Sequence, residues 1–205
     1  MDSVTTYLKD EIPMIRKYIP LQFENPIKIA LQYFPELKNI SIKFKLKENN
    51  SPLSARPTLF SFFKKAQKRK YIIFISTSTH SKFDSILLKN LTFNSQIGVI
   101  GHELSHISFY NKRNSFYFIK LVVMHLSKKS IDKFEYNTDM LCIQHGLGYQ
   151  LLSWSTEVRM KLNLIQWKGI KQMQANGRER YMNPQSIIDT IQALKMYVNV
   201  AKPTN

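Results

Sequence analysis

The sequence is poor in cysteine and in acidic residues. Its one cysteine, Cys142, excludes an intramolecular disulfide framework. The 205 residues include only 14 Asp and Glu against 30 Lys and Arg, a formal net charge of +16. This excess of positive charge suits nucleic acid, an anionic membrane surface or an acidic protein partner, or it serves to keep the surface soluble. The basic residues are scattered, and only one run is dense: Lys64, Lys65, Lys68, Arg69 and Lys70.

Long apolar runs are also absent from the sequence. A bilayer-spanning helix needs about 20 predominantly apolar residues. The most apolar stretch, 116–126, is shorter and contains Lys120 and His125. The N-terminus lacks the basic segment and apolar run of a secretory signal. We therefore expect a soluble, cytoplasmic protein with no transmembrane segment.

The hydrophobic fraction of 43% indicates a folded core. Residues 40–47 alternate apolar and polar side chains, which predicts a half-buried strand, and 71–75 are rich in β-branched and aromatic residues, which predicts a second. We expect these strands to pair in one small sheet. Asn and Pro residues mark 48–58 as a loop. Capping signals and helical spacing predict helices at 3–19, 25–34, 85–91, 95–110, 115–126, 130–145 (ended by Gly146), 155–175 and 183–200.

No internal repeat or low-complexity linker divides the chain. We therefore predict one domain over residues 1–205, with a core at about 40–150 and helical additions at both ends. The expected fold class is α+β, mostly helical with a small sheet.

The stretch 99–107, Val-Ile-Gly-His-Glu-Leu-Ser-His-Ile, holds the clearest functional signal. Residues four apart share one face of a helix, so His102 and His106 can bind one metal ion. Glu103 lies beside them, placed to take a proton from a water molecule. This H-E-x-x-H spacing is typical of zinc hydrolases. The alternative is a helix with two hydrogen-bonded core histidines, but Glu103 would then be costly to bury among its apolar neighbours.

A hydrolytic zinc ion normally has three protein ligands. The metzincin pattern is absent, because Phe109 and Lys112 stand where it needs glycine and histidine. Glu135 is the better candidate, and Asp139, one turn further along the same helix, can accept the spare N–H of a ligand histidine. The alternatives are a solvated acidic pair on a helix surface, or a third ligand from Asp132, His125 or His145. We interpret Cys142, one turn beyond Asp139, as a buried structural thiol.

Together, the stretches 96–106 and 134–139, the latter continuing to Gly146, make the chain resemble the gluzincin metallopeptidases. More narrowly, it is similar to the catalytic domain shared by the CAAX-prenyl endopeptidases and the bacterial heat-shock membrane proteases. The resemblance covers about residues 70–150. Since the chain lacks the spanning helices of the membrane members, it resembles a soluble, minimal form. The resemblance implies a zincin-like fold, in which a small sheet packs on the active-site helix and an edge strand holds an extended substrate.

Carried over by position, His102, His106 and Glu135 bind one Zn²⁺ per chain, Glu103 is the general base and Asp139 orients a ligand histidine. We therefore predict a zinc metalloendopeptidase that hydrolyses a protein or peptide substrate. Such chemistry also needs an oxyanion donor, for which the candidates by residue type are Arg178, Arg180, Tyr181, His145 and Tyr149.

Two other functions fit the sequence. One is a zinc-binding domain that is latent or non-proteolytic, for instance because a terminal helix blocks the cleft. The other is a basic nucleic-acid-associated protein, which is less favoured because aromatic residues are not interleaved with the basic cluster.

Overall fold

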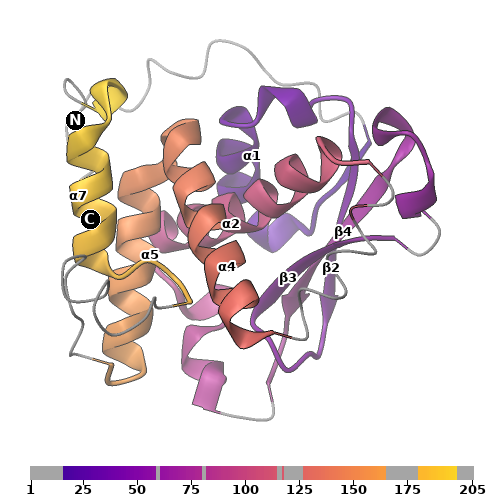
Figure 1. Cartoon of the computed structure of the whole chain (residues 1–205). Coiled ribbons are helices and arrows are strands. Elements are labelled where there is room, and N and C mark those ends of the chain that lie inside the picture. The colour runs from indigo at the N-terminus through magenta and orange to yellow at the C-terminus, as the bar shows by residue number, and fades with distance from the viewer. Residues whose placement is uncertain are drawn as a thin grey trace, which may run out of the picture.

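The computed structural model of the chain describes residues 16–58, 61–79, 82–114, 117, 127–164 and 180–197. Within them the fold is α+β, with helices predominating beside one small sheet, as the sequence predicts (Figure 1). The α-helices are α1 (Glu24–Gln32), α2 (Phe93–Asn111), α4 (Lys128–Cys142), α5 (Gly148–Lys161) and α7 (Pro184–Ala193).

The sheet has four strands in the order β1-β2-β4-β3, namely β1 (Lys17–Tyr18), β2 (Ser41–Lys47), β4 (Lys70–Ser76) and β3 (Leu53–Pro57). β2 pairs in parallel with β1 and β4, and β3 pairs antiparallel with β4. The predicted pairing of the two strands is confirmed. Ile42 and Phe44 are buried while Lys43 and Lys45 are exposed, which confirms the alternation.

Strand β3 lies within 48–58, so the prediction of a loop there was wrong. Pro52 and Pro57 suggested a loop because proline cannot donate to a ladder. Ladder bonds join β3 to β4 at Pro52 O and Thr58 N. Between these two residues, every second residue of β3 directs its backbone N–H and C=O toward β4, and the others direct theirs to the open edge of the sheet. Ala55 and Pro57 belong to the second group, so the missing N–H of Pro57 breaks no ladder bond.

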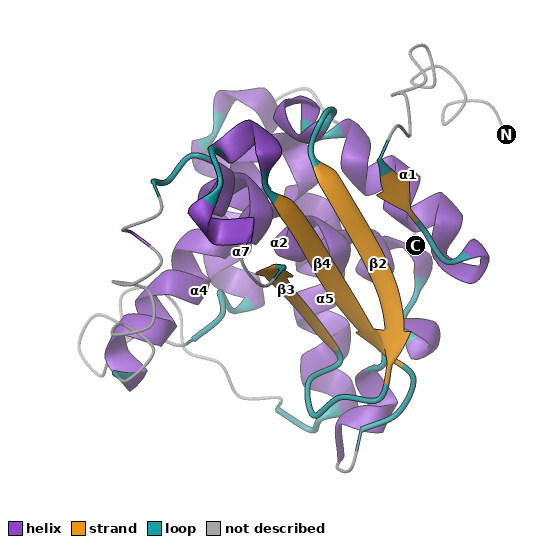
Figure 2. Ribbon diagram, turned by 90° about the vertical axis from the view of Figure 1, so that its right-hand side faces the viewer, coloured by secondary structure: helices purple, strands orange, loops and turns teal. Residues whose placement is uncertain are grey.

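The α-helices pack on one face of the sheet, and Figure 2 shows them behind the strands. Helix α2 is the central one: every residue from Ile97 to Ser108 is buried. Apolar side chains of the strands and of α2 join one hydrophobic cluster that also takes in α1 and α7; its fully buried members include Ile27, Ile42, Ile73, Ile75, Ile100, Leu104, Ile107 and Ile187.

Helix α2 begins at Phe93, two residues before the predicted start at residue 95. Both the backbone N–H and the hydroxyl of Thr92 donate to the Glu157 carboxylate of α5. A negative charge at a helix N-terminus is favourable. The start of α2 is therefore set by an acid distant in sequence.

The sequence predicts that the helix at 130–145 ends at Gly146 and that another begins at residue 155, but the structure has no such break. Helix α4 begins after Ser127, whose side chain accepts the Ser130 N–H. It ends at Cys142, and a π-helical turn, Ile143–Leu147, leads directly into α5. Gly146 has a φ of 96°, the left-handed conformation expected of a capping glycine. The chain nevertheless re-enters a helix after it, so Gly146 forms a kink.

Other boundaries differ in detail. Asn183 caps α7 through the Ser186 N–H, as predicted, but α7 ends at Ala193. Helix α1 begins at Glu24, two residues before the predicted start at Pro26. The predicted helix at 85–91 is two 3₁₀ turns, Lys82–Ile86 and Leu88–Asn90. Of the predicted helix 3–19, residues 3–15 lie outside the described residues, and Lys17–Tyr18 form β1.

The predicted helix 115–126, apart from Tyr117, and the part of 155–175 from residue 165 onward also lie outside the described residues. Among the helices that the structure describes, none has the length and apolar character needed to cross a bilayer.

Candidate metal centre

Helix α2 carries three polar side chains into the interior. His102, Glu103 and His106 are only 2%, 6% and 6% exposed. The two histidines are one helical turn apart, and their ring centroids are 4.8 Å apart. Because α2 is buried on all sides, these polar groups depend on partners from other elements.

Helix α4 brings Glu135 to the two histidines. Glu135 Oε2 lies 3.2 Å from His102 Nε2 and 3.3 Å from His106 Nε2. One nitrogen or oxygen from each of the three side chains lies within 4.8 Å of the others, a grouping able to hold a metal ion. The structure thus brings together the three residues that the sequence singles out as ligands.

The alternative third ligands do not join this group. Asp132 accepts a hydrogen bond from Arg180 Nε at 3.1 Å. His145 lies between Glu36 and the Leu141 carbonyl. His125 is outside the described residues. Cys142 is fully buried, as predicted, and burial raises the pKa of its thiol, so it stays protonated.

Two residues of α4 determine the tautomers of the histidines. Asp139 Oδ1 lies 2.8 Å from His102 Nδ1, and Asp139 Oδ2 accepts the Met182 N–H at 2.7 Å. Thr138 Oγ1 donates to the Phe134 carbonyl and lies 3.3 Å from His106 Nδ1, so it is left to accept from that nitrogen. In the neutral form of each imidazole, Nδ1 therefore carries the proton, and in both rings the Nε2 atom faces Glu135.

Glu103 contacts the edge strand of the sheet. Its carboxylate accepts a hydrogen bond from the Ala55 N–H of β3, while its Oε2 atom is buried and has no hydrogen-bond partner among the described residues. Burial raises the pKa of Glu103, and the neighbouring imidazoles oppose that rise. A carboxyl group with a raised pKa is suited to accepting and returning a proton near neutral pH.

The charges of the three candidate ligands are coupled. Burial acts to lower the pKa of His102, but the hydrogen bond to Asp139 and the negative charges of Asp139 and Glu135 raise it well above its usual value. Burial acts to raise the pKa of Glu135, but the two imidazoles lower it below its usual value. The group thus favours positive charge, from protons or from a metal ion, at its centre.

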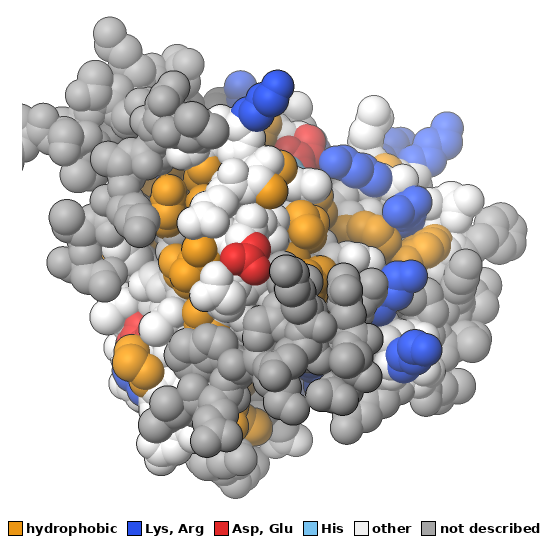
Figure 3. Space-filling view, turned by 60° about the vertical axis from the view of Figure 1, so that its left-hand side comes forward, with side chains coloured by type: hydrophobic (Ala, Val, Ile, Leu, Met, Phe, Trp, Pro, Cys, Tyr) orange, Lys and Arg blue, Asp and Glu red, His pale blue; other side chains and the backbone are white. Residues whose placement is uncertain are grey.

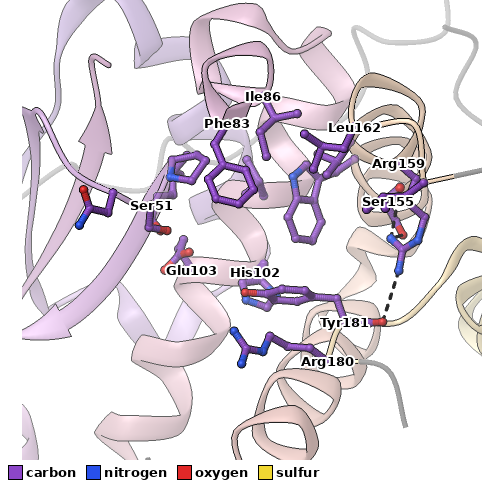
Figure 4. Close-up of a pocket in the computed structure, with 17 residues that line it drawn as sticks. Ser51, Phe83, Ile86, His102, Glu103, Ser155, Arg159, Leu162, Arg180 and Tyr181 are labelled. Atoms are coloured by element: carbon purple, nitrogen blue, oxygen red, sulfur yellow. Dashed lines mark hydrogen bonds between the residues drawn. The ribbon is translucent and has the colours of Figure 1, made fainter. Parts of the chain in front are cut away.

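A cavity of about 600 Å³ opens beside His102 and Glu103. Figure 4 shows Tyr181 lying across His102, with Phe83 and Ile86 on the opposite wall. Most of the lining is apolar, including Leu53, Phe83, Ile86, Val99, Trp154, Val158, Leu162 and Leu164. The cavity can therefore enclose an apolar group next to the polar centre.

Of the candidate oxyanion donors, the structure brings Tyr181 and Arg180 to this cavity. The Tyr181 ring centroid is 5.6 Å from that of His102 and 5.8 Å from that of Trp154. Burial and the nearby carboxylates raise the pKa of Tyr181, so its hydroxyl keeps its proton. His145 is bound to Glu36, Tyr149 packs on Tyr197, and Arg178 lies outside the described residues.

Sequence reasoning missed two contributors to this centre. Thr138 had a signal, because a second ligand histidine also needs an acceptor at Nδ1 and Thr138 precedes Asp139. Ala55 had no such signal, because it acts through its backbone amide.

Comparisons of the chain with family models, with curated proteins and with solved structures find no match. What the centre can do therefore follows from its own geometry and chemistry.

Proposed function

We propose that this protein is a zinc-dependent metalloendopeptidase with a zincin-like fold, in which His102, His106 and Glu135 bind one Zn²⁺ per chain. The observation that carries the proposal is the convergence of His102 Nε2 and His106 Nε2 on Glu135 Oε2, at 3.2 and 3.3 Å. The ligand atoms of the three side chains lie within 4.8 Å of one another, a grouping that could hold one metal ion. Two imidazoles and a carboxylate are the ligand types of hydrolytic zinc sites.

Two buried carboxylate oxygens support the same proposal. Glu103 Oε2 and Glu135 Oε2 have no hydrogen-bond partner within the described part of the chain. A buried carboxylate oxygen without a partner is costly. A cation bound by Glu135, with a water molecule beside Glu103, would satisfy both oxygens.

Zinc held by these ligands supplies Lewis acidity, which polarises a carbonyl and lowers the pKa of a water molecule toward about 7. Glu103 carries out the proton transfers: its Oε2 takes a proton from the attacking water and returns it to the leaving amine. The bond from the Ala55 N–H fixes the orientation of the Glu103 carboxylate during both steps.

The substrate in this proposal is a protein or peptide in extended form along the open edge of β3. An edge strand binds a peptide through its free backbone groups, and the backbone N–H of Leu53 faces the open edge. The neighbouring cavity takes a large apolar side chain of the substrate. The contact of this edge with α2 supports the zincin-like arrangement.

Tyr181 is the residue that we propose as the oxyanion donor, because its protonated hydroxyl belongs to a side chain that lies over His102. Tyr181→Phe should lower kcat about 100- to 1,000-fold, with zinc content unchanged. Steady-state kinetics on a cleavable peptide, with zinc measured in the same samples, checks this. A normal kcat in the variant would transfer the role to Arg180.

The central experiment combines metal analysis with proteolysis. The purified protein should contain about one zinc per chain, Glu135→Ala should lose it, and Glu103→Gln should keep zinc and lose cleavage of an unfolded protein. Glu24→Gln, which only disturbs the surface pair with Lys28, is the control and should behave as the wild type. Absence of zinc from the wild type would exclude the proposal.

A zinc-binding domain without peptidase activity is the second candidate, favoured by the burial of His102 beneath Tyr181. It gives bound zinc without cleavage until residues near either end are removed. The proposal places the enzyme in the cytoplasm, a compartment in which a free thiol such as that of Cys142 is the normal state.

A further inference from the structure

The face of the sheet that points away from the helices has a distinct composition. We call it the outer face and define it by Lys43, Lys45 and Lys47 of β2, Ser54 and Arg56 of β3, and Lys70, Ile72 and Phe74 of β4. Strand register places these side chains side by side: Lys43 is opposite Ile72, and both Lys45 and Ser54 are opposite Phe74. Figure 2 shows no labelled helix in front of this face.

The outer face is strongly cationic. Its four lysines and Arg56 are all exposed, and no Asp or Glu occurs in any of the four strands. Residues two apart in a strand are about 6.6 Å apart, so Lys43, Lys45 and Lys47 form a row of regularly spaced charges. A row of this kind matches a linear polyanion better than a compact one.

Apolar side chains lie between the charges of the outer face. Ile72 and Phe74 are half-buried, and the Arg56 guanidinium lies 5.0 Å from the Phe74 ring centroid. A hollow of about 300 Å³ is lined by Lys47, Asn49, Ser54, Arg56 and Phe74. It combines an aromatic floor, two cations and groups that form hydrogen bonds.

The dense basic run of the sequence is a different surface. Arg69 is buried, and it donates to the Tyr110 and Arg113 carbonyls at the end of α2, so its role there is structural. Lys64, Lys65 and Lys68 are exposed but lie in 3₁₀ turns and loops, outside the strands.

We propose that the outer face binds single-stranded nucleic acid, with the lysine row along the phosphates and a base against Phe74 and Arg56. Exposed cations beside an aromatic ring are the elements by which sequence-tolerant proteins bind single strands. Insertion into a membrane would require protruding apolar groups, whereas Ile72 and Phe74 are half-buried, with Lys43 and Arg56 on either side of Ile72 and with Lys45 and Ser54 on either side of Phe74.

The test is fluorescence anisotropy of labelled oligo(dT) with the full chain. The wild type binds, and Lys43→Gln/Lys45→Gln/Lys47→Gln weakens binding about tenfold or more and reduces the slope of log affinity against log salt by about 2. The control, Lys64→Gln/Lys65→Gln/Lys68→Gln, removes the same charge from the other surface and changes affinity much less.

Phe74→Leu should weaken binding of oligo(dT) roughly five- to a hundredfold at unchanged charge. Thermal unfolding checks that this variant is folded. Glu103→Gln should bind oligo(dT) as the wild type does, so the outcome is independent of the peptidase proposal.

Four results would overturn the inference. The first is no binding of oligo(dT) by the wild type. The second is an equal loss of affinity in the two lysine variants. The third is an unchanged affinity in Phe74→Leu. The fourth is binding to phosphatidylserine vesicles that needs the same lysines, with none to oligo(dT), which would assign the face to membranes.

Discussion

Two neighbouring residues of α4, Thr138 and Asp139, decide which nitrogen of each buried histidine is free. Both accept hydrogen bonds from Nδ1 atoms, so both Nε2 atoms face Glu135. Such acceptors are part of a metal site because they fix the tautomer and raise the basicity of the ligand. Asp139 also accepts the Met182 N–H, which holds the segment bearing Tyr181 beside the histidines.

Asp139→Asn should weaken zinc binding. An amide offers one oxygen to two donors, so either the His102 Nδ1–H or the Met182 N–H loses its acceptor. We expect zinc affinity to fall about 10- to 100-fold, measured by competition with a chromophoric chelator. The matched control is Asp189→Asn on α7, where the carboxylate accepts from the Gln185 amide. Equal affinities in the two variants would show that Asp139 has no such role.

At the scale of elements, the contact between α2 and α5 depends on a residue without a side chain. A Cβ at Gly98 would lie 2.2 Å from the Gln150 carbonyl oxygen. A backbone carbonyl cannot move aside without displacing α5. The close approach of these helices keeps His102 and Glu103 next to Trp154 and Val158 at the cavity wall.

Gly98→Ala should therefore lower the free energy of unfolding by about 1–3 kcal/mol. The sign of this change is informative, because replacing glycine by alanine inside a helix otherwise stabilises it by about 1 kcal/mol. Gly101→Ala is the comparison, since its new Cβ meets the mobile end of Leu147 and should cost less. Urea unfolding measures both, and a more stable Gly98→Ala protein would refute the packing argument.

Glu36, in the 3₁₀ turn η3 (Pro35–Leu37), connects three elements. It accepts from Ser108 Oγ of α2 at 2.5 Å and lies 2.9 Å from His145 Nε2 of the π-helical turn. Burial acts to raise the pKa of Glu36, but these hydrogen bonds lower it to about 2. Since the folded-state pKa lies below the ordinary value of 4.5, the stabilisation is present above that pH and is lost as pH falls through about 2.

Glu36→Gln should lower the free energy of unfolding by about 1–3 kcal/mol near neutral pH, because it removes the negative charge that strengthens both hydrogen bonds to Oε1. The difference from the wild type should narrow as pH falls below 4.5. Urea unfolding over a series of pH values tests both statements. A difference that stays constant down to pH 2 would exclude ionised Glu36 as its source.

The elements that the sequence predicts well are those whose signal is local. The alternation of 40–47 predicts β2, and the apolar spacing around His102 predicts α2. Strand β3 is short and contains prolines at positions that only the pairing makes acceptable, so its local signal is that of a loop. The Glu157 cap of α2 and the Ala55 amide at Glu103 arise from tertiary contacts, which residue spacing does not encode.

For the whole molecule, the proposed zinc ion would join α2 to α4. Ligand binding to the folded state alone adds about 4 kcal/mol of stability when the free metal is 1,000 times its Kd. For a chain of this size that corresponds to about 8–16 °C in Tm. Exhaustive chelation should therefore lower the Tm by about this amount, measured by calorimetry. The Tm of Glu135→Ala should not respond to chelator, and a response equal to that of the wild type would place the metal elsewhere.

The net charge of the chain suits an anionic partner or a soluble surface, and it does not say where a partner would bind. On the face in Figure 3, Lys and Arg side chains are spaced apart along one side, with few Asp or Glu. The strands concentrate charge differently, because alternation places every lysine of β2 on one face. The alternation of residues 41–47 therefore predicts where the positive charge lies, whereas the net charge of the chain does not.

Successive residues of strand β3 point to opposite faces of the sheet: the odd-numbered residues face α2, and the even-numbered residues lie on the outer face. The loss of one residue from the preceding turn would exchange them, bringing the Arg56 amide to Glu103 and turning the guanidinium inward. Evolution can therefore lengthen or shorten this turn only in steps of two residues without losing the contacts of both faces at once.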